Sequence, residues 1–262
     1  MDETVQISEV EIHTSLQGGE AGQIIYFNDR AKKMGSHWVP FDPNRGGDKI
    51  ITWLSDQIDG AANGCTLAET QAAVSRAMTT WNNVKGATIP LVEWPDYGMD
   101  WGYVQSLMDF GGFPGWYADI TQAGWLPREF FTAWFGEEES EYILGVTFTL
   151  IWIDSETGLP TDMDNNRKQD VAFREVYYNN FFTWAIDLEG WSQKIDVESI
   201  VLHENGHGLS LGHFGKLTRT PNGKLHWSPE AVMNAGYVYP QRELSGTDTA
   251  AFYSIWASWP NN

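Results

Sequence analysis

Three histidines and one glutamate near position 200 have the spacing of a catalytic zinc site. His203, Glu204 and His207 form an HExxH pattern, and His213 follows six residues after His207. On an α-helix, residues four apart lie on one face about 6 Å from each other, so two imidazoles can reach one ion. Three neutral histidine ligands leave a fourth zinc position for water, which is typical of catalytic rather than structural zinc. The pattern therefore predicts a catalytic Zn²⁺ site.

The glutamate suggests a general base, and the third histidine requires a turn in the chain. Glu204 adjoins a ligand but points in another direction, so its carboxylate is free to act as general base on water at the zinc. A straight helix would carry His213 about 240° past His207, so the chain must turn between them. Gly208 and Gly212 supply the backbone freedom for that turn. The alternative is a polar helix face whose histidines only form hydrogen bonds, and the third histidine argues against it.

This segment resembles the metzincin clan of zinc peptidases, and within it the matrixin-like group. The clan pattern HExxHxxGxxH is matched, except that Ser210 stands at the position of the glycine. A left-handed backbone at Ser210 would cost roughly 1–2 kcal/mol. Alternatively, the neighbouring glycines shift the turn by a residue or two, and the three ligands are the same in either case.

A second match to the clan lies downstream, where residues 231–237 resemble its Met-turn. In matrixins a tyrosine four residues after the methionine helps to wall the substrate pocket, and Tyr237 stands at that offset from Met233. Ala235 occupies the position of the metal-binding tyrosine of astacins and serralysins, so the resemblance implies no tyrosine ligand here. Without the family, Met233 is simply a core residue that fills an irregular gap.

Capping signals and apolar periodicity place these motifs on helices and strands. Asp196 is expected to cap the helix that carries the HExxH pattern, and capping boxes begin helices at Thr66 and Ser245. Strands are expected at 49–54, 89–94, 117–122 and 143–153, and a short helix at 127–135.

The resemblance implies a fold of the α+β class, a metzincin-like zincin domain. A twisted mixed sheet would carry the active-site helix, and a small C-terminal subdomain would carry His213, Met233 and the last helix. A length of 262 residues with 42% hydrophobic residues suits one large domain or one and a half. Residues 1–45 read as an N-terminal arm or extension, and 46–262 as the catalytic domain.

A polar segment after the 143–153 strand resembles the first part of a calcium loop. Oxygen-bearing side chains stand at its positions 1, 3, 5 and 9: Asp162, Asp164, Asn166 and Asp170. Arg167 replaces the usual glycine and Phe173 the usual glutamate, so the pattern is incomplete, and Glu175 or Asp154 would have to complete the shell. Matrixin-like domains commonly hold structural calcium, which favours Ca²⁺, whereas a plain polar loop is the alternative.

Charge and composition restrict the partners. Acidic residues number 35 and basic residues 16, which gives a net charge of −19 and argues against nucleic acid or an anionic membrane as partner. No apolar run reaches the roughly 18 residues of a membrane span. Cys65 is the single cysteine, so no intrachain disulfide is possible. The first residues lack a signal-peptide pattern, but the resemblance implies export, so we expect a secreted or extracytoplasmic protein in trimmed form.

Together these observations predict a zinc metalloendopeptidase, a hydrolase that cleaves internal peptide bonds of a protein or peptide substrate. Two alternatives remain: a catalytically silent zinc-binding scaffold or recognition module, and a zinc hydrolase of non-peptide amides. His13, His37 and His226 are scattered along the chain and lack the pattern of the second zinc site of animal matrixins, so none is expected. We expect the protein to be a monomer.

Overall fold

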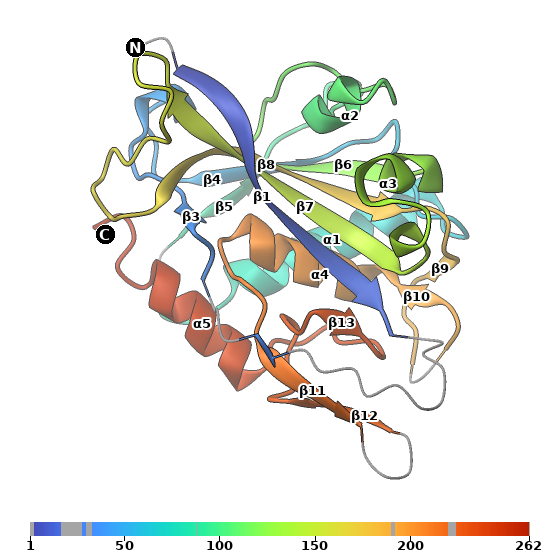
Figure 1. Cartoon of the computed structure of the whole chain (residues 1–262). Coiled ribbons are helices and arrows are strands. Elements are labelled where there is room, and N and C mark those ends of the chain that lie inside the picture. Colours follow the sequence, from blue (N-terminus) through green and yellow to red (C-terminus); the bar gives the residue numbers. More distant parts are fainter. Residues whose placement is uncertain are drawn as a thin grey trace.

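The computed structural model describes residues 3–16, 28–29, 33–87, 89–189, 192–219 and 224–261. Within these residues the chain forms an α+β fold with a mixed, twisted sheet and five α-helices (Figure 1). The sheet has eight strands in the order β13-β1-β7-β8-β6-β4-β5, with β3 attached to β8. Their bounds are β1 Glu3–Ser15, β3 Ser36–His37, β4 Ile51–Ser55, β5 Leu91–Glu93, β6 Ile120–Leu126, β7 Ile143–Asp154, β8 Gln169–Asn179 and β13 Gly236–Tyr237.

The sheet divides into a parallel and an antiparallel part. Strands β5, β4, β6 and β8 run parallel, whereas β7 is antiparallel both to β8 and to β1. The short β13 then pairs in parallel with the end of β1. All of β7 except its last residue is buried, so both faces of this strand are covered.

Helices cover both faces of the sheet. On one face α1 (Leu67–Asn82), α4 (Val197–Gly208) and α5 (Gly246–Trp256) share one apolar core with β4, β6 and β8. The other face carries α2 (Tyr103–Leu107) and α3 (Arg128–Phe135), whose apolar side chains pack with those of β7. Figure 1 shows α2 and α3 on the side of the molecule away from α5. In the part of the chain described, no helix is long and apolar enough to cross a membrane.

The three predicted helix caps are confirmed. Thr66 and Glu69 form a reciprocal capping box at α1, and Ser245 and Asp248 do the same at α5. The side chain of Asp196 accepts from the backbone N–H of Ser199 and so caps α4. Each cap satisfies amides that the helix itself leaves without a partner, so local sequence chemistry fixes where these helices begin.

Two strands depart from the sequence expectations. The first is β1, which adds residues 3–15 of the expected N-terminal arm to the central sheet. The second is β8, a strand of 11 residues that sequence periodicity did not indicate. Arg174 and Glu175 interrupt the apolar run of β8, and a bulge between Ile7 and Glu9 interrupts the alternation of β1. Both interruptions hide the period-two pattern by which a strand is recognised.

The remaining elements are small and lie at the periphery. A three-stranded sheet is formed by β2 (Asn28–Asp29), β11 (Gly215–Arg219) and β12 (Leu225–Ser228), and a two-stranded one by β9 (Trp184–Ala185) and β10 (Ile195–Asp196). Two 3₁₀-helices, η1 (Pro43–Arg45) and η2 (Glu139–Glu141), complete the described chain.

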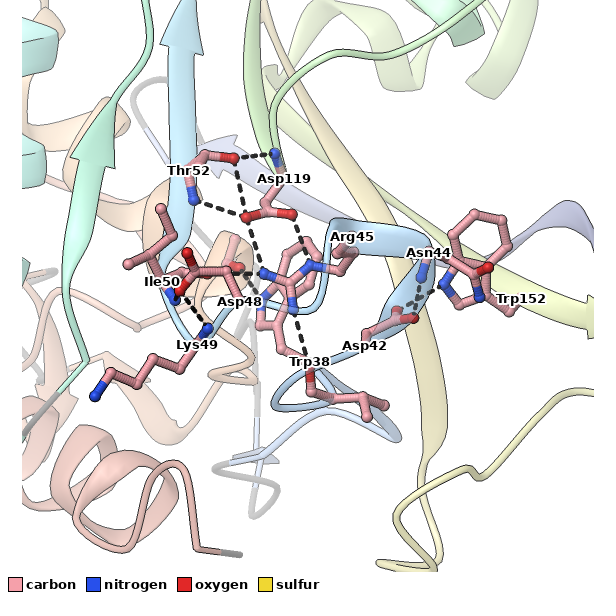
Figure 2. Close-up of polar contacts among 12 residues, drawn as sticks. Trp38, Asp42, Asn44, Arg45, Asp48, Lys49, Ile50, Thr52, Asp119 and Trp152 are labelled. Atoms are coloured by element: carbon pink, nitrogen blue, oxygen red, sulfur yellow. Dashed lines mark hydrogen bonds and ion pairs between the residues drawn. The ribbon is translucent and has the colours of Figure 1, made fainter.

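A polar cluster fastens the segment after β3 to the sheet (Figure 2). Arg45 donates to both carboxylate oxygens of Asp119, at 2.7 and 2.9 Å, and to the backbone carbonyl of Ile50. Asp119 also accepts from the N–H and the hydroxyl of Thr52. The Arg45 guanidinium lies 4.9 Å from the centre of the Trp38 ring. The ion pair is almost completely buried, and the indole N–H of Trp38 donates to the Gly208 carbonyl at the end of α4.

Candidate metal centre

Three imidazoles converge at the C-terminal end of α4. The distances between their Nε2 atoms are 3.1 Å from His203 to His207 and 3.0 Å from His213 to each of the others. A triangle of this size has its corners about 1.8 Å from its centre, which is less than the roughly 2.0–2.1 Å bond between zinc and histidine nitrogen. One ion can therefore contact all three nitrogens.

The opposite nitrogen of each ring faces a hydrogen-bond acceptor. Nδ1 of His203 lies 2.7 Å from the Val232 carbonyl, and Nδ1 of His207 lies 2.8 Å from the Leu211 carbonyl. Nδ1 of His213 lies 3.3 Å from a carboxylate oxygen of Glu11. Since these acceptors have no proton to give, each ring carries its proton on Nδ1 and turns the lone pair of Nε2 toward the centre.

Burial keeps the three rings neutral. It lowers the pKa of His203 and His207 well below the usual value, and that of His213 to about 4. Neutral imidazole is the form that binds a metal. Three lone pairs that face one another across 3.0 Å repel, and a cation between them removes that repulsion. The donor set thus fits zinc.

The turn that brings His213 back to the helix passes through Ser210. Ser210 has a φ of 67°, so it takes the left-handed conformation that the sequence left open as one of two alternatives. Its hydroxyl accepts a hydrogen bond of 2.8 Å from Nη1 of Arg174 and contacts Nδ1 of His37 at 3.1 Å. A bond to a charged donor contributes about 1.5–3 kcal/mol, which offsets the roughly 1–2 kcal/mol of backbone strain.

Two residues that the sequence analysis missed hold the end of α4. Arg174 is fully buried in β8 and donates to the Gly208 carbonyl at 3.0 Å and to the hydroxyls of Thr149 and Ser36. Trp38 donates from its indole to the same Gly208 carbonyl at 3.1 Å. Burial lowers the pKa of Arg174 only to about 10, so it stays charged at neutral pH. An arginine inside an apolar run was the only sequence signal for this role.

Glu204 lies beside the triad, with one carboxylate oxygen fixed and the other free. Its Oε2 accepts a hydrogen bond of 2.6 Å from the hydroxyl of Thr147 on β7. Within the described residues its Oε1 has no hydrogen-bond partner. A Cβ at Gly145 would lie 2.9 Å from Oε1, so glycine on β7 leaves room for this side chain. Burial raises the pKa of Glu204 well above its usual value, which suits a group that accepts and returns a proton.

Met233 packs against α4. A Cβ at Gly206 would lie 2.2 Å from the Met233 sulfur, so the two residues pack at van der Waals limits. The carboxylate of Asp248 accepts from the N–H groups of Val232 and Met233 at 3.0 and 3.1 Å. Because the Val232 carbonyl orients His203, the cap of α5 also positions one histidine of the triad.

Tyr237 is buried on β13, next to the start of α4. Its hydroxyl accepts a hydrogen bond of 3.3 Å from the backbone N–H of Asp196, and burial raises the pKa of this phenol. Its ring lies edge-on to His13, with the centroids 6.4 Å apart. Tyr237 therefore contacts the start of α4 and His13, and its role in a substrate pocket stays a prediction.

His13 adjoins the histidine triad from β1, although the sequence left it unassigned. Its ring stacks on that of His203, with the centroids 3.7 Å apart and an angle of 20° between the planes. Ligand atoms of His13, His203 and Glu204 lie within 4.8 Å of one another. Of the two other unassigned histidines, His37 contacts Ser210, and His226 is exposed on β12. No local signal could have placed His13 here, because the contact joins residues far apart in the chain.

The acidic segment after β7 brings three carboxylates together. Oxygen atoms of Asp162, Asp164 and Asp170 lie within 4.8 Å of one another. Asp170 is buried, and its Oδ1 has no hydrogen-bond partner in the described part of the chain. Burial, with repulsion from the two neighbouring carboxylates, raises the pKa of Asp170 to about 6.

Other oxygens considered for this loop have partners elsewhere. Asn166 accepts from the backbone N–H of Lys168 at 2.8 Å and donates to Asp164. Glu175 accepts from the first amides of α2 and from the Tyr177 hydroxyl, so it does not complete a shell here. Asp154 caps its own turn by accepting from residues 156 and 157. The structure thus brings together three of the four predicted side chains, those of Asp162, Asp164 and Asp170.

Comparison with known proteins adds no assignment. No protein-family model matches the chain, and a search of curated proteins finds no match. The chain nevertheless carries a buried triad of His203, His207 and His213 that fits the HExxH pattern with a third histidine and could hold a metal such as zinc.

Proposed function

We propose that this protein is a zinc-dependent endopeptidase of the metzincin clan, with the features of its matrixin-like group. The observation that carries the proposal is the convergence of three unprotonated Nε2 atoms beside a glutamate with one free carboxylate oxygen. The Met233 turn beneath α4 and the position of Tyr237 support the same assignment.

The chain supplies each role that peptide hydrolysis requires. A zinc ion held by the triad supplies a Lewis acid and makes water a nucleophile near neutral pH. Glu204 takes the proton of the attacking water on Oε1 and passes it to the leaving amine. Thr147 holds the other oxygen of this carboxylate, and Gly145 of the same strand leaves room for Oε1. Val232, Leu211 and Glu11 fix the ring orientations through Nδ1.

The two alternatives differ in what they require of Glu204. A silent zinc scaffold needs the three histidines only. In such a scaffold, the buried carboxyl group of Glu204 with one unsatisfied oxygen would destabilise the fold and serve no purpose. That cost favours a catalytic role. A hydrolase of non-peptide amides would use the same residues, so only an assay with a peptide substrate can distinguish it from a peptidase.

The test is cleavage of unfolded casein by the zinc-loaded protein, with and without a chelator. Glu204→Gln is the matched variant, because its amide oxygen can still accept from Thr147 while its proton-accepting ability is lost. We expect chelator-sensitive cleavage by the parent protein and at least a 100-fold loss in the variant with full zinc content. Cleavage at the parent rate by Glu204→Gln would rule out the assigned base.

We further propose a structural calcium ion at Asp162, Asp164 and Asp170, with Asn166 in the same loop. The buried Oδ1 of Asp170, which lacks a donor among the described residues, supports this site because calcium prefers carboxylate oxygens. A peptide substrate, a monomeric state and an extracytoplasmic location are proposals of the same kind. The net charge of −19 favours neither nucleic acid nor an anionic membrane as partner.

A further inference from the structure

A small pocket lies where the segment at β3, the loop between β7 and β8 and the end of α5 meet. Its volume is about 200 Å³, and its lining includes Lys33, His37, Asn166, Lys168 and Ser258. Figure 1 shows the chain after α5 beside the loop between β7 and β8. No acidic side chain of the described residues lines this pocket, although the chain has 35 acidic residues and a net charge of −19.

Two lysines of this pocket are held in place without a carboxylate partner. Nζ of Lys33 donates to the Ser254 carbonyl at 2.8 Å. Nζ of Lys168 donates to the Met34 carbonyl at 2.7 Å. Neither lysine forms an ion pair with a described residue. Since an ammonium group has three N–H donors, each lysine keeps two of them for a further acceptor.

The positive charge at this pocket is not neutralised by the described chain. Burial, with repulsion from Lys33 and Arg174, lowers the pKa of Lys168 to about 8. The charge of Glu9 opposes this shift, but its carboxylate accepts from the Ser36 hydroxyl and from a backbone N–H. Arg174 donates only to hydroxyls and a carbonyl. An anion in the pocket would remove this repulsion.

His37 lines the pocket from β3 and is only 5% exposed. Its ring packs against the rings of Trp256 and Trp259, with centroids 4.8 and 6.1 Å away. Burial, with repulsion from Lys168 and other nearby cations, lowers the pKa of His37 well below its usual value. The ring is therefore neutral and carries one proton, on one of its two nitrogens.

Ser210 decides which nitrogen of His37 carries that proton. The Ser210 hydroxyl is buried and accepts from Arg174, which has no acceptor to offer. Its other hydrogen-bond contact among the described residues is Nδ1 of His37 at 3.1 Å, so the hydroxyl donates its proton there. The ring proton is then on Nε2. This nitrogen has no partner in the described part of the chain and is not completely enclosed, so its N–H can donate to a ligand in the pocket.

We propose that this pocket binds a tetrahedral oxyanion of the phosphate or sulfate type. Lys33, His37 and Lys168 all present donors, two of them cationic, and such an oxyanion presents acceptors. The donors come from separate segments of the chain, and four oxygens in a tetrahedron can meet them better than the two coplanar oxygens of a carboxylate. The pocket has room for such an ion with water. Because Lys33 is exposed at its mouth, the oxyanion can be a free ion or the phosphate of a larger molecule.

The pocket shares a chain of hydrogen bonds with the turn that leads to His213. An oxyanion at Nε2 of His37 keeps the proton on that nitrogen, so Nδ1 stays the acceptor for the Ser210 hydroxyl. The same hydroxyl is the group that binds Arg174. The pocket therefore supports the left-handed turn from outside the histidine triad, and the proposal does not depend on the proposed peptidase function.

Calorimetric titration of sulfate into the whole chain tests the pocket. Sulfate is the probe because, unlike phosphate, it leaves zinc in solution, and sodium chloride keeps the ionic strength constant. We expect saturable binding of one sulfate. Lys33→Met and Lys168→Met should each weaken it at least tenfold, because each removes a charged donor and keeps the apolar stem. Lys85→Met, at an exposed lysine elsewhere, changes the net charge equally and should bind sulfate as the parent does.

An NMR spectrum of the histidine ring nitrogens gives a second readout that needs no lysine variant. The parent should show His37 with its proton on Nε2, and sulfate should shift this signal, which His37→Phe identifies by its loss. A proton on Nδ1, or a signal that sulfate leaves unchanged, would overturn the proposal. This measurement remains decisive if a lysine variant fails to fold.

The remaining outcomes concern the identity of the ion. If the parent shows no saturable binding, or if the double lysine variant binds sulfate as tightly as the parent, the pocket is not an oxyanion site. If acetate competes as well as sulfate, the occupant is a carboxylate and the proposal fails. In metal-free protein, displacement of sulfate by both phosphate and phenyl phosphate would support a phosphate ester as occupant. Displacement by phosphate alone would support the free ion.

Discussion

Ser210 offers the most informative single perturbation, because two substitutions separate its two contributions. Its backbone is left-handed, with a φ of 67°, and its hydroxyl accepts from the buried Arg174. Ser210→Ala removes the hydrogen bond and keeps the strain, so it should lower the free energy of unfolding by about 1.5–3 kcal/mol. Ser210→Gly removes both, and relief of roughly 1–2 kcal/mol of strain should make it the milder change.

Thermal unfolding of the metal-free proteins measures the difference. At this chain length 1 kcal/mol corresponds to about 2–4 °C in Tm, so Ser210→Ala should melt several degrees below the parent and Ser210→Gly between the two. Both should also bind zinc more weakly, because the turn that delivers His213 is less firmly held. If Ser210→Ala is as stable as the parent, or more stable than Ser210→Gly, the account of this turn is wrong.

Three further predictions concern the metal centre and the acidic loop. His207→Ala should lose bound zinc, as measured by metal analysis after gel filtration. Glu204→Ala should retain zinc and lose nearly all turnover. If His207→Ala retained its zinc, the triad would not be the zinc site. Met233→Ala should cost about 2–5 kcal/mol of unfolding free energy in a denaturant titration and leave the zinc content unchanged, because it opens a cavity beneath α4 without touching a ligand. Calcium should raise Tm at about pH 7.5 and much less at about pH 5, because Asp170, with a pKa of about 6, must lose its proton to bind the ion. Without calcium the sign is opposite: a carboxyl with a raised pKa in the folded state stabilises at low pH and loses that contribution as the pH rises through 6. An equal calcium effect at both pH values would refute the site.

The features that the sequence predicted are those that local chemistry decides. The HExxH spacing places His203 and His207 on one helix face, and the caps at Thr66, Asp196 and Ser245 set where helices begin. Each depends on residues within one helical turn of each other. The periodicity of short segments therefore contains the necessary information.

The features that the sequence did not reveal depend on contacts between distant segments. Arg174 reaches Gly208 and Ser210 from another strand, and His13 meets His203 only because β1 joins the edge of β7. Nothing in the residues around His13 indicates that it lies beside the triad. The choice between a left-handed Ser210 and a shifted turn also needed these distant partners, because Arg174 supplies the compensating hydrogen bond.

The double role of Asp248 determines when the centre can be assembled during synthesis. This carboxylate caps α5 and also holds the amides of the Val232–Met233 turn, whose carbonyl orients His203. Trp256 of the same helix donates to the Leu209 carbonyl, at the start of the turn toward His213. Although all three histidines of the triad precede α5 in the chain, the ribosome must release this helix before their rings reach this orientation, so the triad is completed only at the last stage of folding.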